Sequence, residues 1–234
     1  LNQLKIGIAV FPGTWSETDT HYATQHVLGI TSEYIWHKDQ NLNNVDFIVL
    51  PGGFSYGDYL RTGAIASFSP IMEKIKEFAN SGGPVLGICN GFQILCESNL
   101  LPGILIRNKT LSFVCKNSNL KVNNNSRFTN LYKKDQIIKI PISHGEGNYQ
   151  ADKNTINKLE EENRIIFRYS STSGDISEEY NPNGSINNIA GIINDEGNIL
   201  GMMPHPEKAC EKIIGSDDGL GIFSSIISSM VKNG

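Results

Sequence analysis

Several features that would identify a membrane protein or a nucleic-acid-binding protein are missing from this 234-residue sequence. No apolar stretch approaches the ~20 residues that a membrane-spanning helix needs. The net charge is −4 and no basic run is longer than Lys133-Lys134, which argues against a nucleic-acid surface. The first five residues run straight into a strand-like segment, so no secretory signal is visible. We therefore expect a cytoplasmic protein that binds neither membranes nor nucleic acid.

Cysteine is also scarce, and its spacing excludes two common uses. The four cysteines are Cys89, Cys96, Cys115 and Cys210, and no C-x-x-C pair occurs among them. No pair of cysteines or histidines has the spacing of zinc ligands, so we expect no metal site. A chain of this size does not need disulfides to be stable, and we expect free thiols in a reducing compartment.

Nucleotide-binding loops are missing as well. No G-x-x-x-x-G-K-[ST] segment occurs, because the glycine-rich stretch 52–57 is followed by Asp58-Tyr59 where a phosphate loop has lysine and then serine or threonine. No G-x-G-x-x-G segment follows a predicted strand. We therefore expect no bound ATP and no other cofactor in this chain.

The first hundred residues alternate between strand-like and helix-like segments. Short apolar runs predict strands at 4–10, 33–36, 45–50 and 84–88. Capping residues and glycines predict helices at 16–28, 69–80 and 90–99. This alternation predicts a flavodoxin-like α/β fold in three layers, with a doubly wound, mostly parallel sheet. In such sheets ligands bind at the carboxyl ends of the strands.

From Leu100 onward the pattern changes, because predicted strands follow one another with few helices between them. These strands are expected at 104–107, 111–115, 119–122, 136–141, 164–169, 189–193 and 198–203. They predict an antiparallel β extension within a single domain spanning residues 1–234. The Asn-rich segment 117–126 is interpreted as a surface turn, and 171–187 as a mobile excursion.

Cys89 lies in the segment Gly87-Ile88-Cys89-Asn90-Gly91, between a predicted strand and a predicted helix. A sharp strand-to-helix turn forces its central residue into a strained conformation and leaves no room for bulky neighbours on either side. The turn also places the thiol at a helix N-terminus, which stabilises a thiolate. An isolated cysteine is usually a small buried hydrophobe, but this setting favours a nucleophile.

A thiol nucleophile needs a proton acceptor that later donates, and histidine suits both roles. Of the five histidines, His205 has the most informative neighbours, since Pro206 favours an extended backbone. Residues two apart in an extended segment face the same way, so Glu207 could orient the ring of His205. The sequence thus predicts a catalytic triad of Cys89, His205 and Glu207, although it does not show that the segments meet.

Acyl transfer also requires donors for the oxyanion. The N–H of Asn90 directly follows the nucleophile, as in other strand-to-helix elbows. A second N–H is expected from Gly53 or Phe54, in the loop after the neighbouring strand. Taken alone, Gly52-Gly53 is more typical of a plain tight turn.

These segments together resemble the class I (triad) glutamine amidotransferases. The elbow continues as Phe92-Gln93, and the histidine lies in Gly201-Met202-Met203-Pro204-His205-Pro206-Glu207. Two further segments, Pro51–Arg61 and His144–Tyr149, are similar to the glutaminase subunits of phosphoribosylformylglycinamidine synthases. The resemblance as a whole runs over nearly the whole chain. The family often carries Ser-Asn-Cys-Asp after Phe-Pro-Gly, whereas here Thr14–Glu17 follows.

The resemblance implies a reaction and roles for several residues. Cys89 would attack the side-chain amide of L-glutamine, release ammonia and leave a glutamyl thioester that water hydrolyses. By family position, the substrate would be held by Phe54, Gln93 and the backbone at His144-Gly145. The residues expected near a partner interface are Tyr56, Arg61 and Glu146.

The resemblance also implies partners, because free ammonia is useless to a chain that activates no acceptor. We expect a synthetase subunit that holds ATP, Mg²⁺ and formylglycinamide ribonucleotide, and a small third subunit as in bacterial versions. Three alternatives stay open: a glutaminase for another synthetase, a γ-glutamyl hydrolase or cysteine peptidase on the same fold, and a catalytically silent assembly module.

Overall fold

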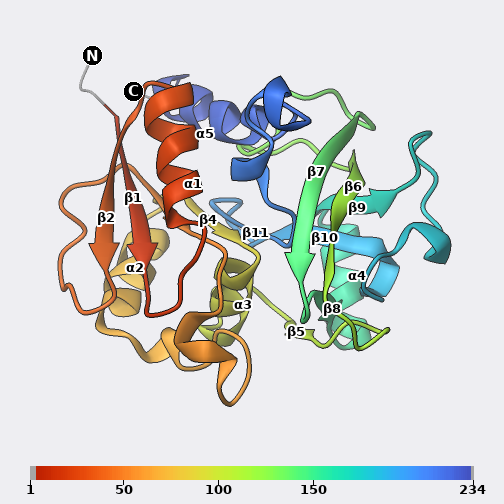
Figure 1. Cartoon of the computed structure of the whole chain (residues 1–234), viewed down its shortest axis with the longest axis horizontal. Helices are drawn as coiled ribbons and strands as arrows, with labels where there is room; N and C mark the ends of the chain where they lie inside the picture. The colour runs from red at the N-terminus through yellow and green to blue at the C-terminus, as the bar shows by residue number, and fades with distance from the viewer. Residues whose placement is uncertain (1–3, 233–234) are drawn as a thin grey trace.

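The computed structural model describes residues 4–232 and contains a nine-stranded sheet with helices on both faces (Figure 1). The strands are β1 (Lys5–Val10), β2 (Thr31–Trp36), β3 (Phe47–Leu50), β4 (Val85–Ile88), β5 (Ile104–Ile106), β6 (Val114–Val122), β7 (Ile137–His144), β8 (Asn148–Gln150), β9 (Ile165–Ser170), β10 (Ile189–Ile193) and β11 (Ile199–Met202). The helices are α1 (Glu17–His21), which continues as a π-helix (Tyr22–Val27), α2 (Pro70–Asn80), α3 (Asn90–Glu97), α4 (Lys153–Glu161) and α5 (Leu220–Lys232).

One half of the sheet is parallel, with the order β2-β1-β3-β4-β11. Its central strands β3, β4 and β11 are apolar and buried at every position, as strands covered on both faces must be. Helix α1 packs on β1, whereas α3 packs on β3, β4 and β11. Figure 1 shows α1 and α5 on one side of this half and α2 and α3 on the other. The predicted doubly wound architecture is confirmed.

The other half of the sheet is antiparallel and continues the order as β11-β10-β9-β6-β7. A separate two-stranded sheet joins β5 to β8. The predicted antiparallel extension is therefore confirmed. Within residues 4–232, no helix has the length and apolar character that crossing a membrane requires.

The strand expected at 119–122 is confirmed, whereas the expectation of a surface turn over the Asn-rich segment 117–126 is wrong for residues 117–122. Residues 117–122 belong to β6, which is one strand from Val114 to Val122 rather than two short ones. They pair with β7 on one side and β9 on the other. Partners that lie distant in the sequence thus override the low strand propensity of asparagine and lysine.

Helix α4 was not expected, since the region was thought to hold few helices. The side chain of Asp152 caps it by accepting hydrogen bonds from the N–H groups of Asn154 and Thr155. Ile156 and Leu159, three positions apart, are its buried residues. A local capping signal was therefore present, but the apolar face is too narrow to be conspicuous.

The excursion 171–187 is anchored rather than loose. It contains a short 3₁₀ turn at Glu178–Tyr180, and another at Ile186–Asn188 begins within it. Between the two turns, the side chains of Asn183 and Ser185 are buried. The expectation of a mobile segment does not fit this end of it, because these buried polar groups hold it to the rest of the fold.

Candidate active site

Cys89 occupies the bend between β4 and α3. Its backbone has φ 51° and ψ −104°, a strained combination for any residue with a side chain. The residue directly precedes the first turn of α3 and is 5% exposed. The thiol is therefore held at the N-terminal end of a helix and at the carboxyl end of the central strand.

The two glycines of the elbow are required by close contacts. A Cβ atom on Gly91 would lie 1.9 Å from the carbonyl oxygen of Leu50, and one on Gly87 would lie 2.4 Å from Leu95 Cδ1. Neither position has space for a side chain, because β3 and α3 pack directly against the bend. The sequence pattern around Cys89 thus reflects the packing of the sheet edge.

The pairing of β4 with β11 brings the distant His205 segment to Cys89. In this parallel pair Ile88 lies opposite Met202, and the N–H of Cys89 donates to the carbonyl of Met202 at 2.7 Å. Both strands end here, so the chains that follow them leave the sheet side by side. The N–H of His205 then donates to the carbonyl of Pro141 at 2.8 Å, which fixes it against β7.

His205 and Glu207 form a buried pair, with 2.6 Å between Nδ1 and Oε1. They do not meet through an extended backbone, as the sequence suggested: Pro206 and Glu207 begin a 3₁₀ turn (Pro206–Lys208) that folds the carboxylate back under the ring. Burial lowers the pKa of His205, but the negative charges of Glu207 and Cys89 outweigh it and raise the pKa to about 10. Among the described residues, Nε2 of His205 has no hydrogen-bond partner.

The loop after β3 lies beside the elbow and carries the second candidate oxyanion donor. The N–H of Phe54 donates to the carbonyl of Gly13 at 2.8 Å, so it is already engaged. A Cβ atom on Gly53 would meet Gly13 and Trp15 backbone atoms at 2.7 Å. Of the two residues considered, Gly53 is therefore the better donor. The other candidate, the N–H of Asn90, lies in the first turn of α3, where N–H groups have no partner within the helix.

The thiol of Cys89 lines a cavity of about 220 Å³. The four residues expected to bind substrate line the same cavity, together with one expected oxyanion donor and one residue expected at an interface. They are Phe54, Gln93, His144 and Gly145, then Gly53, then Glu146. Other lining residues were not singled out from the sequence: Asp58, Thr62, Arg107, Leu111, Phe113 and Ser143. No cluster of three or more metal-binding side chains occurs in the described part of the chain.

Comparison with known proteins agrees with this geometry. The CobB/CobQ-like glutamine amidotransferase domain matches residues 3–218. Phosphoribosylformylglycinamidine synthase subunit PurQ from Moorella thermoacetica is 55% identical over 96% of this chain and 95% of its own length. The corresponding subunit from Salinibacter ruber is 48% identical, covering 96% of both chains. This chain belongs to the PurQ family of glutamine amidotransferases.

Solved structures agree with the assignment to the PurQ family. A chain from the structure of PurLQS from Thermotoga maritima matches with a TM-score of 0.86 and 38% identity, covering 97% of this chain and 99% of that one. Another glutamine amidotransferase from the same organism has a TM-score of 0.61 at 16% identity, covering 99% of both chains, which shows a shared fold.

In this PurQ-family chain, Gln93 forms part of the cavity wall rather than projecting freely. Its Oε1 accepts from Asn90 Nδ2 at 2.9 Å, and its Nε2 donates to the carbonyl of Glu146 at 2.7 Å. The Asn90 side chain in turn accepts from the N–H of Ser55 at 3.2 Å. The elbow, the loop after β3 and the segment after β7 are thus held together by two amide side chains.

His144 is buried, and its ring is held by asparagines instead of pointing to the thiol. Nδ1 lies 3.1 Å from Asn108 Oδ1, and Nε2 lies 3.5 Å from Asn183 Nδ2. Burial, and to a lesser extent the charge of His205, lowers the pKa of His144 to about 4, so the ring is neutral at physiological pH. Asn183 belongs to the excursion 171–187, which therefore stabilises the wall of the cavity.

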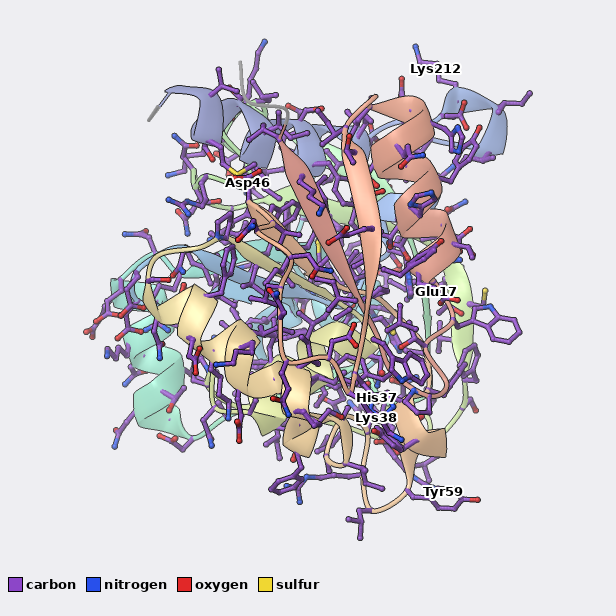
Figure 2. All side chains as sticks on the ribbon, turned by 90° about the vertical axis from the view of Figure 1, so that its left-hand side faces the viewer. Glu17, His37, Lys38, Asp46, Tyr59 and Lys212 are labelled. Atoms are coloured by element: carbon purple, nitrogen blue, oxygen red, sulfur yellow. The ribbon has the colours of Figure 1, made fainter. Side chains whose placement is uncertain are left out.

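The two other residues expected at an interface make internal contacts. The Tyr56 hydroxyl lies 2.8 Å from His37 Nδ1, and Arg61 makes a bidentate ion pair with Glu97, both distances being 2.6 Å. Neither lines the cavity. Their interface role stays a prediction, whereas neighbouring Tyr59 projects outward from this loop, as Figure 2 shows.

The departure from the family pattern at Thr14–Glu17 has a structural explanation. The backbone N–H groups of Trp15 and Ser16 both donate to the carbonyl of Gly52 at 3.0 Å. Any residue other than proline can supply these bonds, because they come from the main chain. These main-chain bonds support the loop after β3 whatever the side chains are, while the Thr14 hydroxyl adds a side-chain contact by accepting from the N–H of Phe11 at 2.9 Å.

Proposed function

We propose that this chain is the glutaminase subunit of a phosphoribosylformylglycinamidine synthase. It would hydrolyse L-glutamine to glutamate and ammonia, and deliver the ammonia for conversion of formylglycinamide ribonucleotide to formylglycinamidine ribonucleotide in purine biosynthesis. The observation that carries the proposal is that a strained Cys89 lies beside the buried His205–Glu207 pair. The sequence of the chain is also 55% and 48% identical to the sequences of two PurQ subunits.

The reaction follows from the roles we assign to these three residues. The sulfur of Cys89 attacks the side-chain carbonyl carbon of glutamine while N–H groups of Gly53 and Asn90 stabilise the oxyanion. His205 holds the thiol proton and passes it to the departing nitrogen, so the C–N bond breaks and ammonia leaves. Water, deprotonated by His205, then hydrolyses the thioester to glutamate and regenerates the thiol. The raised pKa of His205 supports a protonated ring that can donate to the departing nitrogen.

The size of the cavity favours one free amino acid over a peptide. Its volume of about 220 Å³ lies below the ~300–1,000 Å³ of pockets for drug-sized ligands. We assign Phe54, Gln93, His144 and Gly145 to its walls. A peptidase would need an open groove for an extended chain, so this feature argues for the glutaminase.

We propose a synthetase subunit as partner and a small third subunit beside it. The PurLQS structure from Thermotoga maritima, whose matching chain is 38% identical to this one, supports such an assembly. ATP and Mg²⁺ would be bound by the synthetase. The four cysteines, which all lie within the described residues, are free, and this supports a cytoplasmic location.

The decisive experiment separates the two nitrogen sources. In the assembled complex, Cys89→Ala should abolish synthesis with glutamine but leave synthesis with ammonium chloride intact. The matched control is Cys96→Ala, which removes a buried thiol two turns along α3 and should retain glutamine-dependent synthesis. An electrophilic glutamine analogue should label Cys89 and spare the exposed Cys115. Glutamine hydrolysis by Cys89→Ala would refute the assignment.

A further inference from the structure

The cavity beside Cys89 has a charge arrangement that the triad does not explain. Two carboxylates, Asp58 and Glu146, line it together with one cation, Arg107. The Arg107 Nε lies 3.7 Å from Glu146 Oε1, and its side chain is 76% exposed. One weakly paired, solvated cation therefore faces two acids.

Asp58 is the less satisfied of the two acids. Its Oδ1 is buried and, within residues 4–232, accepts no hydrogen bond. Burial, followed by the negative charge of Glu146, raises the pKa of Asp58 to about 6. Its backbone is in the left-handed region at φ 57°, so the loop holds this carboxylate at a conformational cost. Glu146 is oriented by Thr62, whose hydroxyl donates to Oε2 at 3.1 Å.

The position of Cys89 indicates how glutamine would be oriented in the cavity. Cys89 lines the cavity and marks the end where the scissile amide must lie, whereas His205 is not among the lining residues. The other end of glutamine carries an ammonium and a carboxylate, and an ammonium requires acceptors that are not already used. Asp58 Oδ1 is an acceptor of this kind in the same cavity as the thiol.

We propose that Asp58, assisted by Glu146, binds the α-ammonium group of glutamine and thereby makes the site specific for the free amino acid. This inference rests on the proposed glutaminase function. The bound ammonium would give Asp58 its missing hydrogen-bond donor and would reduce the electrostatic repulsion between the two carboxylates. An amide without the α-ammonium would leave the buried acceptor unsatisfied and would be rejected.

The test compares glutamine with glutaramic acid, which has the same side-chain amide and carboxylate but no α-amino group. Ammonia release is measured for both with the assembled complex. Asp58→Asn should raise KM for glutamine on the order of 10- to 100-fold, the value of a charge-assisted hydrogen bond. The same variant should leave kcat/KM for glutaramic acid unchanged or increase it. Asparagine tolerates the positive φ, so the loop should keep its shape.

The matched control is Asp135→Asn, because Asp135 is also an aspartate at positive φ (65°) but is exposed and paired with Lys121 outside the cavity. It should leave both substrates unaffected. Glu146→Gln provides a second variant and should raise KM for glutamine by a smaller factor. Synthesis with ammonium chloride verifies that each complex is assembled and folded.

Three results would overturn the inference: equal losses for the two substrates, no loss for either, or impaired assembly with an unchanged KM for glutamine. The last would make Asp58 part of the partner interface. Failure of the glutaminase proposal is distinct, since the wild-type complex itself would then release no ammonia from glutamine.

Discussion

The strain at Cys89 predicts an unusual order of stability between two inactive variants. Its backbone, at φ 51° and ψ −104°, is unfavourable for alanine but readily adopted by glycine. Such a conformation costs a residue with a Cβ about 1–3 kcal/mol. Glycine carries an opposing cost of roughly 0.5–1 kcal/mol, because its unfolded state is more flexible. We therefore expect Cys89→Gly to be about 1 kcal/mol more stable than Cys89→Ala.

The measurement is the free energy of unfolding from urea titrations of the two variants, since both lose the same thiol and differ only at the Cβ. The control pair is Cys96→Gly and Cys96→Ala, in the interior of α3. There glycine should be about 1 kcal/mol less stable, as in an ordinary helix. If Cys89→Gly is also the less stable of its pair, the elbow is not strained and the reasoning fails.

Three further predictions follow from the site. Gly91→Ala should lower the free energy of unfolding by at least about 3 kcal/mol, because its Cβ would lie 1.9 Å from the Leu50 carbonyl oxygen; wild-type stability in a urea titration would contradict this. In assays of glutamine hydrolysis, Glu207→Ala should lose less activity than His205→Ala, because it orients rather than transfers the proton, and the reverse order would reject these roles. The pKa of Asp58 is raised to about 6, so this carboxyl binds a proton more tightly in the folded protein than in the unfolded chain. Ionised Asp58 therefore lowers the free energy of unfolding above pH 6. This destabilisation decreases as the pH falls through 6 toward 4. The shift corresponds to about 3 kcal/mol, which solvent screening of this half-exposed group reduces to about 1 kcal/mol; Asp58→Asn should gain that much stability at pH 8 and nothing at pH 4, and a gain that is the same at both would exclude the mechanism.

The parts of the fold that were predictable are those with local causes. Gly87 and Gly91 flank Cys89 because β3 and α3 leave no room for side chains at these two positions. The constraint is therefore recognisable in the five consecutive residues 87–91. The buried strands of the parallel half are recognisable because both of their faces are covered, which makes them continuously apolar. The pairing of the elbow with His205 was predicted from the proton acceptor that a thiol nucleophile needs, but the register of β4 and β11 that brings the two segments together was not.

The parts that were missed depend on contacts between distant segments. Residues 116–118, which lie between two strands predicted to be separate, continue one long strand because they pair with β7. Asn183 belongs to a polar segment whose composition predicts mobility. Its side chain nevertheless donates to the carbonyl of Gly147 at 2.8 Å and to the Tyr169 hydroxyl at 3.2 Å. Asp58 had no distinguishing neighbour in the sequence. Its importance comes from Glu146, which follows β7 and reaches the same cavity.

Some of the unfavourable features of this structure lie at the candidate active site, where a substrate would relieve them. Within the described residues, buried side-chain atoms without hydrogen-bond partners include His205 Nε2, Glu207 Oε2 and Asp58 Oδ1, and Cys89 adds its strained backbone. Each costs on the order of 1–3 kcal/mol and would not persist in a fold selected for stability alone. A glutamine amide at Cys89 and an ammonium at Asp58 would compensate for part of this cost on binding. The fold thus holds these groups in place before the substrate arrives, as electrostatic catalysis requires.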